Sequence, residues 1–306
     1  MNRFAYQEAR TLHEAVTLLG QTAGARLMAG ATDVLIRWRQ GVLKPPCVIN
    51  IKRIPGLDEV SYSPGTGLRL GTLVTIRTLE RHARIREHYP ALAQAAMAFA
   101  GVQIRNLATI GGNVCNASPA GDTLPALLAY GAECRLVGPS GERLLPLEQF
   151  FLGPGRTALQ PAELLVELRL PPPLPRTGAL YIKHSPRSTM DIATVGVAAV
   201  ISLAEPSGVC QEVKITLGAV APTVVRATAA EDILRRQSVD AARLQQAAQA
   251  AGEAAQPIDD IRGTAAHRRR VIAPLVQRTL QYAVQMAQGM PIPFQTQRGL
   301  AVEAVF

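Results

Sequence analysis

Residues 108–122 read ATIGGNVCNASPAGD, and this stretch decides how the rest of the chain is interpreted. Its adjacent glycines, Gly111 and Gly112, let the backbone take conformations closed to other residues, and they let a ligand approach without a Cβ in the way. Successive amide groups in such a turn form a nest that binds anions such as phosphate. A pair of glycines also occurs in tight turns that bind nothing. The stretch therefore predicts either a phosphate-binding loop or a purely structural turn.

The polar side chains beside the two glycines favour a ligand. Thr109, Asn113 and Ser118 supply neutral hydrogen-bonding groups, and the Asp122 carboxylate can accept a hydrogen bond from a ribose hydroxyl. Phosphate and ribose together are the polar parts of a nucleotide. These residue types therefore predict a nucleotide-binding loop.

A second glycine loop lies nearer the N-terminus. Residues 27–34, LMAGATDV, again place an apolar strand before a glycine and small polar residues. Neither loop has the GxGxxG pattern of a dinucleotide-binding Rossmann fold, and the GxxxxGK[ST] pattern of a P-loop is absent from the sequence. The two loops together predict that a dinucleotide pyrophosphate is held from two sides by a different fold.

Composition limits the class of protein. The 306 residues are 48% hydrophobic and 18% charged, which is typical of a globular protein with two or three domains. Lys and Arg outnumber Asp and Glu by 32 to 23, a net charge of +9, which raises nucleic acid or an acidic protein surface as a partner. Aromatic residues are only 4% of the chain, too few for a base-stacking platform, so we expect no nucleic acid.

The cysteines indicate where the protein works. Cys47, Cys115, Cys134 and Cys210 form no CxxC pair, so we expect no zinc or iron–sulfur site on this chain. Four scattered thiols also do not make a disulfide framework, which favours a reducing cytoplasm. The sequence has no apolar run near the ~20 residues of a transmembrane helix, and its first residues do not resemble a signal peptide.

Helices and strands are mixed along the whole chain. A Thr11 cap followed by Glu14 starts a helix that Gly20 should stop. We predict helices at 11–20, 77–87, 90–100, 124–130, 227–255 and 264–288, strands at 26–29, 48–52, 68–76, 133–138, 164–170, 192–203 and 212–220, and an irregular segment at 101–123. The basic run at 267–270 should form a solvated or subunit-docking face of its helix.

Proline marks the main domain boundary. Residues 171–175 contain four prolines, which can neither join a β-ladder nor continue a helix. We therefore predict a first domain at 1–175, with sub-lobes at about 1–53 and 54–175, a second α+β domain at 176–290, and an extended tail at 291–306.

Together these features resemble a known family. The two loops, the Glu163-Leu164-Leu165 segment before the prolines, and the KHSPR sequence from Lys183 to Asp191 are similar to the FAD-binding medium subunit of the molybdenum hydroxylases, which include xanthine dehydrogenase and carbon monoxide dehydrogenase. The resemblance covers nearly the whole chain. It implies an α+β protein, with an FAD-binding fold of the PCMH (vanillyl-alcohol-oxidase-like) type followed by a smaller domain of the carbon monoxide dehydrogenase flavoprotein type.

The resemblance also implies which residues bind the cofactor. The FAD pyrophosphate would lie against Leu27, Met28, Ala29, Gly30, Ala31, Thr32, Asp33, Val34, Ala108, Thr109, Gly111, Gly112, Asn113 and Ser118. Asp122 would hold a ribose-type hydroxyl, while Phe99 and Leu165 would lie near the adenine or the flavin. Lys183 would approach the isoalloxazine, where a cation stabilises negative charge on the reduced ring; without the resemblance, Lys183 would be taken as a solvated strand-end lysine.

Two details qualify this assignment. Ala31 stands where the family commonly has a second glycine, so the first loop must turn there with a negative φ or accept strain. The five histidines share no ligand spacing and lie outside both loops, so we expect FAD to be bound non-covalently. No catalytic residue and no metal ligand is predicted on this chain.

The implied function is electron transfer. The chain would take electrons from [2Fe–2S] clusters on a small partner subunit, with molybdopterin on a large one, and pass them to an external acceptor; a dimer of heterotrimers is expected. The substrate and the acceptor, whether NAD, a quinone or oxygen, stay open. Two alternatives also stay open: a stand-alone FAD oxidoreductase, and a basic scaffold protein whose glycine loops are structural.

Overall fold

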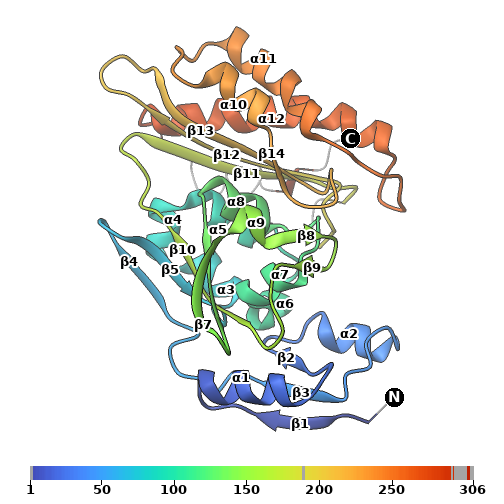
Figure 1. Ribbon diagram of the computed structural model, residues 1–306. Coiled ribbons are helices and arrows are strands. Elements are labelled where there is room, and N and C mark those ends of the chain that lie inside the picture. The colour runs from blue at the N-terminus through green and yellow to red at the C-terminus, as the bar shows by residue number, and fades with distance from the viewer. Residues whose placement is uncertain (1–2, 188–189, 291, 293–301, 304–306) are drawn as a thin grey trace.

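The computed structural model describes residues 3–187, 190–290, 292 and 302–303, and the chain forms three stacked bodies (Figure 1). The N-terminal lobe is a parallel sheet in the order β1-β3-β2 with two helices. Its elements are β1 (Ala5–Glu8), α1 (Leu12–Gln21), β2 (Arg26–Met28), α2 (Val34–Arg39) and β3 (Cys47–Asn50).

The first helix begins as the sequence predicts but ends differently. The Glu14 amide donates to Thr11 Oγ1 at 3.1 Å, and the Glu14 carboxylate accepts from the Arg10 amide at 2.7 Å, so both groups of the predicted cap are used. The prediction that Gly20 stops the helix is wrong, because α1 continues to Gln21. Gly20 needs no special conformation, and a Cβ there would meet only Ala162 at 3.6 Å.

The middle lobe is an antiparallel sheet in the order β4-β5-β10-β6-β7, packed against short helices. Its strands are β4 (Val60–Ser63), β5 (Gly67–Gly71), β6 (Glu133–Gly138), β7 (Gly141–Pro146) and β10 (Leu164–Leu170), with a small hairpin of β8 (Phe151–Gly153) and β9 (Arg156–Thr157). Its helices are α3 (Ile76–Arg81), α4 (Ala83–His88), α5 (Pro90–Ala98), α6 (Val102–Leu107), α7 (Ile110–Asn116), α8 (Thr123–Ala129) and α9 (Leu147–Phe150).

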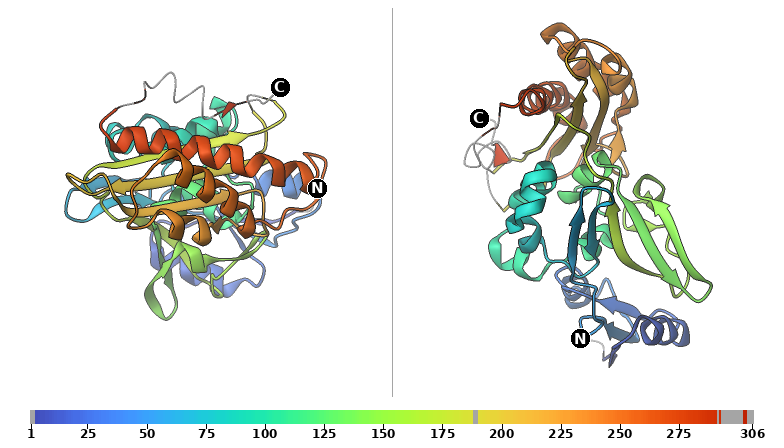
Figure 2. Two further views of the ribbon diagram at one scale, coloured as in Figure 1. Left: turned by 90° about the horizontal axis from the view of Figure 1, so that it is seen from above. Right: turned by 90° about the vertical axis from the view of Figure 1, so that its left-hand side faces the viewer.

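The C-terminal domain is a second five-stranded sheet, in the order β14-β13-β12-β11-β15. Its strands are β11 (Thr177–His184), β12 (Val195–Leu203), β13 (Cys210–Gly218), β14 (Val225–Arg226) and β15 (Val302–Glu303). Helices α10 (Thr228–Leu234), α11 (Ala241–Ala250) and α12 (Ala265–Ala287), with a 3₁₀ turn at Ala251–Ala254, cover one face (Figure 2). The other face packs on α5 and α8 of the middle lobe.

The middle lobe and the C-terminal domain share one apolar core. The core cluster of the middle sheet and its helices also contains Ala179, Tyr181 and Ala198, which belong to β11 and β12. A second cluster fills the space between the C-terminal sheet and its helices, and a third fills the N-terminal lobe. Burial of apolar area stabilises packing by roughly 25 cal/mol per Å², so this continuous core fixes β11 against α5 and α8.

Three predictions about the elements are corrected. The segment at 101–123 is not irregular, because it contains α6 and α7. The predicted helix at 77–87 is two helices, α3 and α4, divided where His82 takes an extended conformation. The predicted strand at 68–76 ends at Gly71, and β11 was not predicted.

The basic run at 267–270 is also only partly solvated. Arg268 is buried, and its guanidinium binds the Thr194 carbonyl at 3.2 Å and the Asp260 carboxylate at 2.7 Å, whereas Arg269 and Arg270 are exposed. Of the predicted tail, only Ile292 and β15 lie within the described residues. Among all the residues that the structure describes, no helix is long and apolar enough to cross a bilayer.

Candidate functional site

The first glycine loop joins β2 to α2 and contains a strained residue. Ala31 has φ = 60°, in the left-handed region, and its carbonyl accepts from the Leu35 amide at 3.1 Å as α2 begins. A non-glycine residue pays about 1–2 kcal/mol for this conformation. Of the two possibilities that the sequence left open, a negative φ or strain, the loop takes strain.

The amide groups of this loop lack protein partners. Within the described residues, the backbone N–H groups of Gly30, Ala31 and Thr32 donate no hydrogen bond to any protein acceptor, although all three residues are half-buried. Unpaired amides away from bulk water are costly, and successive amides around a left-handed residue form an anion-binding nest. The loop therefore has the geometry and the free donors to bind an anionic group such as a pyrophosphate.

The glycine pair of the second loop has no such free donors. Thr109 caps α7, and the first four amides of the helix are all bonded to protein. These bonds run from Ile110 to Val74 O at 2.8 Å, from Gly111 to Thr72 O at 3.0 Å, from Gly112 to Thr109 Oγ1 at 3.1 Å and from Asn113 to Thr109 O at 3.0 Å. The predicted glycine turn is thus the first turn of a capped helix, with its donors already used.

The two glycines of the second loop have different reasons for being glycine. A Cβ on Gly111 would lie 1.7 Å from Thr72 Oγ1, so Gly111 is required by packing. Gly112 is exposed, and a Cβ there would meet nothing within 4 Å except Thr109 Oγ1 at 2.9 Å. Gly112 therefore leaves an open face on α7 that a ligand can approach.

The two loops touch one another, as the sequence predicted for a shared ligand. A Cβ on Gly30 would lie 1.9 Å from the Leu107 carbonyl oxygen, so the first loop packs directly on the backbone between α6 and α7. The Asn116 side-chain amide also donates to the Asp33 carboxylate at 3.3 Å. The free amides of the N-terminal lobe therefore lie beside the start of α7 in the middle lobe.

A buried charge pair lies on the other side of α7. Thr123 Oγ1 donates to Asn113 Oδ1 at 2.6 Å, which joins α7 to α8, and Asp122 directly precedes α8. The Lys183 ammonium from β11 lies 3.1 Å from Asp122 Oδ2, and the Tyr181 hydroxyl donates to Asp122 Oδ1 at 2.9 Å. Because both partners come from β11, the pair joins the middle lobe to the C-terminal domain.

Lys183 is an interior lysine. Its side chain is 0% exposed, and its ammonium also donates to the carbonyls of Ala98 at 2.7 Å and Asp191 at 2.8 Å. The alternative reading of a solvated strand-end lysine is therefore wrong. Burial raises the pKa of Asp122, and the Lys183 ammonium and the Tyr181 hydroxyl act against that rise.

The remaining predicted residues lie around these loops with less specific contacts. Ala108 is buried between α6 and α7, and its carbonyl accepts from the Ile76 amide. Phe99 follows α5 and packs half-buried against the core that contains Leu165, in β10, on which α7 also packs. Ser118 is half-buried in the turn before α8, and Leu27 packs its side chain into the N-terminal core. Leu27 and Leu165 thus have apolar packing roles.

Several polar contacts near the site were not predicted from the sequence. Tyr181 precedes Lys183 by two residues, so alternation along β11 would have placed both on one face, had β11 been predicted. His184 and His267 lie far apart in the sequence, yet their Nε2 atoms are 3.2 Å apart. Burial lowers the pKa of His184, and His267 adds to the effect. No group of three His, Cys, Asp or Glu side chains within the described residues could hold a metal ion.

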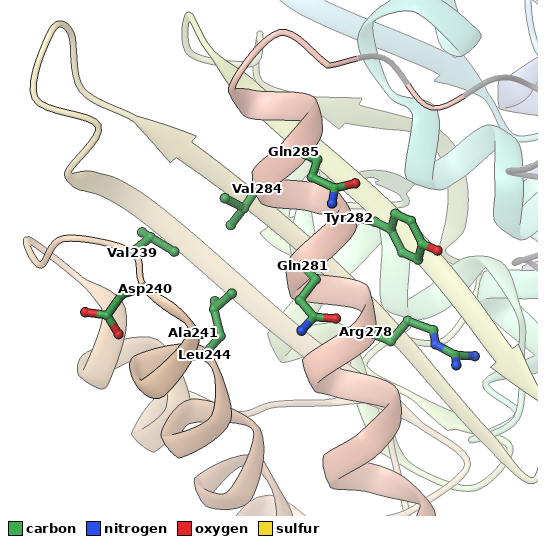
Figure 3. Close-up of a pocket in the computed structure, with 9 residues that line it drawn as sticks. All are labelled: Val239, Asp240, Ala241, Leu244, Arg278, Gln281, Tyr282, Val284 and Gln285. Carbon is green, nitrogen blue, oxygen red and sulfur yellow. The ribbon is translucent and has the colours of Figure 1, made fainter.

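A surface groove of about 620 Å³ between α11 and α12 is separate from these loops. It lies on the outer face of the C-terminal domain and contains none of the predicted site residues (Figure 3). Its lining is mixed and includes Arg278, Gln281 and Tyr282 of α12 together with Asp240 and Leu244 beside and within α11.

Comparison with known proteins agrees with this architecture. Residues 2–173 match the model of the FAD binding domain in molybdopterin dehydrogenase, and residues 180–283 match the carbon monoxide dehydrogenase flavoprotein C-terminal domain. The xanthine dehydrogenase FAD-binding subunit of Escherichia coli O157:H7 is 32% identical over 286 residues, covering 93% of this chain and 97% of that one. The carbon monoxide dehydrogenase medium chain of Hydrogenophaga pseudoflava is 33% identical over 282 residues, covering 92% and 97%.

Solved structures agree as well. A structure of carbon monoxide dehydrogenase from Hydrogenophaga pseudoflava matches with a TM-score of 0.88 at 34% identity, covering 92% of this chain and 97% of that one. Quinoline 2-oxidoreductase from Pseudomonas putida 86 matches with a TM-score of 0.87 at 27% identity, covering 94% and 99%. The resemblance found in the sequence and the predicted fold class are confirmed. With both domain models matched in order and 93% of the chain aligned to an FAD-binding subunit, the chain belongs to the family of FAD-binding subunits of the molybdopterin dehydrogenases.

Proposed function

We propose that this chain binds FAD non-covalently and serves as the electron-transfer subunit of a molybdenum hydroxylase-type complex. The observation that carries the proposal is the run of unpaired amides at Gly30, Ala31 and Thr32, held in a strained turn beside the open face of Gly112. Three free, half-buried amide donors around a left-handed alanine form a nest suited to an anion, and this nest can offset the strain of the alanine. The diphosphate of FAD supplies that anion.

We propose the following contacts with the cofactor. The backbone of residues 27–34 wraps the pyrophosphate, and Thr109, Gly112 and the adjoining residues Ala108, Gly111, Asn113 and Ser118 close the site from the middle lobe. Asp122 accepts a hydrogen bond from a ribose-type hydroxyl through its remaining lone pairs. Phe99 and the backbone of Leu165 border the adenine or the flavin.

Lys183 supplies positive charge at the flavin end of the site. Its ammonium is buried and fixed by three acceptors, so its position costs little additional ordering when the cofactor binds. A cation held there favours negative charge on the reduced ring. When bound, FAD would supply the chemistry of accepting electrons one at a time from the clusters and releasing them singly or as a pair, and the protein fixes its position and tunes its potential.

Partners hold the other redox groups in this proposal. Relatives of this chain are named as FAD-binding subunits and medium chains, and the Hydrogenophaga pseudoflava structure is described as lacking the Mo-pyranopterin moiety of the molybdenum cofactor. The spacing of the four cysteines supports placing the [2Fe–2S] clusters outside this chain. The resemblance implies a small subunit for the clusters and a large one for molybdopterin. We propose a dimer of heterotrimers in the cytoplasm, with the net charge of +9 favouring acidic partner surfaces.

Expression of the full chain without partners tests this function. We expect a yellow protein with one FAD per chain and no iron, which dithionite reduces. Purine, aldehyde or heteroaromatic substrates should not reduce it until the molybdenum and iron–sulfur subunits are added. A colourless protein that does not take up FAD would instead indicate a scaffold, and unaided oxidation of such a substrate would indicate a self-contained flavin enzyme.

A further inference from the structure

The turn after α5 has an unusual set of bonds to cations. Four consecutive carbonyls, from Met97 to Ala100, form what we call the carbonyl turn. The Arg105 Nη1 atom lies 3.2 Å from Met97 O, 3.0 Å from Phe99 O and 2.8 Å from Ala100 O. The fourth carbonyl, that of Ala98, accepts from the Lys183 ammonium at 2.7 Å. Arg105 of the middle lobe thus contacts three of the four carbonyls, and Lys183 of the C-terminal domain contacts the remaining one.

Arg105 is itself fixed in place. Its side chain, on α6, is 12% exposed, and its Nε lies 2.9 Å from the Glu80 carboxylate of α3. Glu80 is held in turn by Arg77, whose Nη1 lies 2.8 Å from the same oxygen. The guanidinium therefore pairs with one carboxylate through Nε, while its Nη1 atom faces three carbonyls.

The carbonyl turn is a place where such control matters. It is the C-terminal end of α5, where unpaired carbonyls carry partial negative charge and attract cations. Ala100 is held at φ = 37°, a conformation that an alanine does not adopt without support. Without Arg105, the carbonyls beside Ala98 would be open to the Lys183 ammonium, which reaches this turn from β11 and already contacts Ala98 O.

We propose that Arg105 is a positioning residue of the flavin site. By occupying three carbonyls, it leaves Ala98 O as the acceptor of the carbonyl turn for Lys183, and so fixes the ammonium beside the isoalloxazine and the Phe99 backbone next to it. This inference rests on the proposed function. It extends the cofactor site to a residue outside both glycine loops, whose contact with the cofactor is indirect.

A purely structural role predicts a different outcome. If Arg105 only caps α5, its removal lowers stability but leaves the bound flavin unchanged. If Arg105 positions Lys183, its removal also alters the flavin: loss of cationic charge at a fixed position disfavours the reduced, negatively charged ring. The midpoint potential of bound FAD separates the two roles.

The experiment compares Arg105→Met and Arg105→Lys in the full chain loaded with FAD. Arg135→Met is the matched control, because Arg135 makes a two-pronged ion pair with Glu142 in the β6–β7 hairpin, within the middle lobe but outside the carbonyl turn. FAD affinity is measured by fluorescence titration, the midpoint potential by dye-coupled reduction and the melting temperature by circular dichroism. Glu80→Gln serves as a milder variant that keeps Arg105 but loosens its orientation.

For Arg105→Met we expect FAD affinity to fall at least about tenfold and the midpoint potential to become more negative. Arg105→Lys and Glu80→Gln should shift both in the same direction by less, and Arg135→Met should shift neither. The inference is overturned if the Arg105 and Glu80 variants melt earlier but keep wild-type affinity and potential. Failure of the wild-type chain to bind FAD would instead contradict the proposed function itself.

Discussion

The two glycine loops look alike in the sequence and differ in the structure. Both follow the pattern of small and polar residues that indicates a phosphate-binding turn, and they lie in contact. In the first loop the amides of residues 30–32 are free and Ala31 is strained. In the second, all the amides from Ile110 to Asn113 are bonded to protein, and no residue of that segment has a positive φ.

The difference teaches which loop can act as the anion nest. A glycine can serve packing, as Gly111 does against Thr72, or it can leave room for a ligand, as Gly112 does. The space around an added Cβ distinguishes these two uses of glycine, whereas the pattern of hydrogen bonds distinguishes the two loops. We therefore assign the pyrophosphate donors to the first loop, and to the second loop a supporting wall with one open position.

The largest effect is expected where the two loops meet. Gly30→Ala would place a Cβ 1.9 Å from the Leu107 carbonyl oxygen, which is backbone and cannot move aside cheaply. We expect no measurable FAD binding and a lower melting temperature, followed by fluorescence titration and calorimetry. Gly20→Ala in the same lobe meets only an ordinary contact at 3.6 Å and should bind FAD normally. Wild-type FAD affinity in Gly30→Ala would show that the loops do not pack as described.

The next effect concerns the support behind the second loop. Asp122→Ala leaves the buried Lys183 ammonium without its carboxylate, and breaking a buried ion pair costs about 3–5 kcal/mol of unfolding free energy. Urea denaturation of the FAD-free protein measures the loss. In the double variant Asp122→Ala/Lys183→Met part of it should return, because no charge is left unpaired.

The surface pair of Asp232 and Arg235 supplies the control, since Asp232→Ala removes an exposed partner and should change stability by less than about 1 kcal/mol. Equal losses for Asp122→Ala and Asp232→Ala would mean that the buried pair does not support the fold.

Gly112→Val tests the open position of α7. The added Cβ meets only the capping hydroxyl of Thr109 within 4 Å, and the side chain lies on the face that we assign to FAD. FAD affinity should fall at least about tenfold, equivalent to 1.4 kcal/mol, with a smaller loss of stability from the cap and from the β-branched residue. Gly65→Val, at an exposed turn with nothing within 4 Å, is the control. Full FAD occupancy in folded Gly112→Val would remove Gly112 from the site.

The smallest effect is expected at Ala31. Ala31→Gly relieves the left-handed strain of about 1–2 kcal/mol. It also lowers the free energy of unfolding by about 0.4–1 kcal/mol, because glycine raises the conformational entropy of the unfolded chain. The net gain in stability should therefore lie between about 0 and 1.6 kcal/mol, with FAD affinity within threefold of wild type. Thermal unfolding with and without FAD checks both values. A clear loss of FAD binding would show that the alanine methyl group itself, and not the turn, makes the contact.

The sequence predicts much of this arrangement because its signals are local. Strand β2 before Gly30 and the Thr11 cap depend on neighbouring residues, whereas the sequence left either a negative φ or strain open at Ala31. Helix α7 was missed because Gly111, Gly112 and Asn113 are poor helix formers. That helix forms because Thr109 caps it and because Ile110 and Val114 are fully buried, and the burial depends on distant parts of the chain.

The interior position of Lys183 was missed for a similar reason. Lysines are rarely buried without a partner, and the partner, Asp122, lies in another domain. The division of the carbonyl turn between Arg105 and Lys183 also requires three segments to meet, so no local pattern encodes it. Pairing of donors and acceptors over long sequence distances is the part of the site that only the fold supplies.

Amide hydrogen exchange of the full chain, with and without FAD, tests the central claim most directly. Exchange reports the opening of each hydrogen-bonded amide. Without FAD, the amides of Gly30, Ala31 and Thr32 should exchange quickly, and those of Ile110 to Asn113 slowly. Addition of FAD should slow exchange in residues 30–32 and change residues 110–113 much less. Protection gained at 110–113 with none at 30–32 would contradict the assignment of the pyrophosphate donors to the first loop.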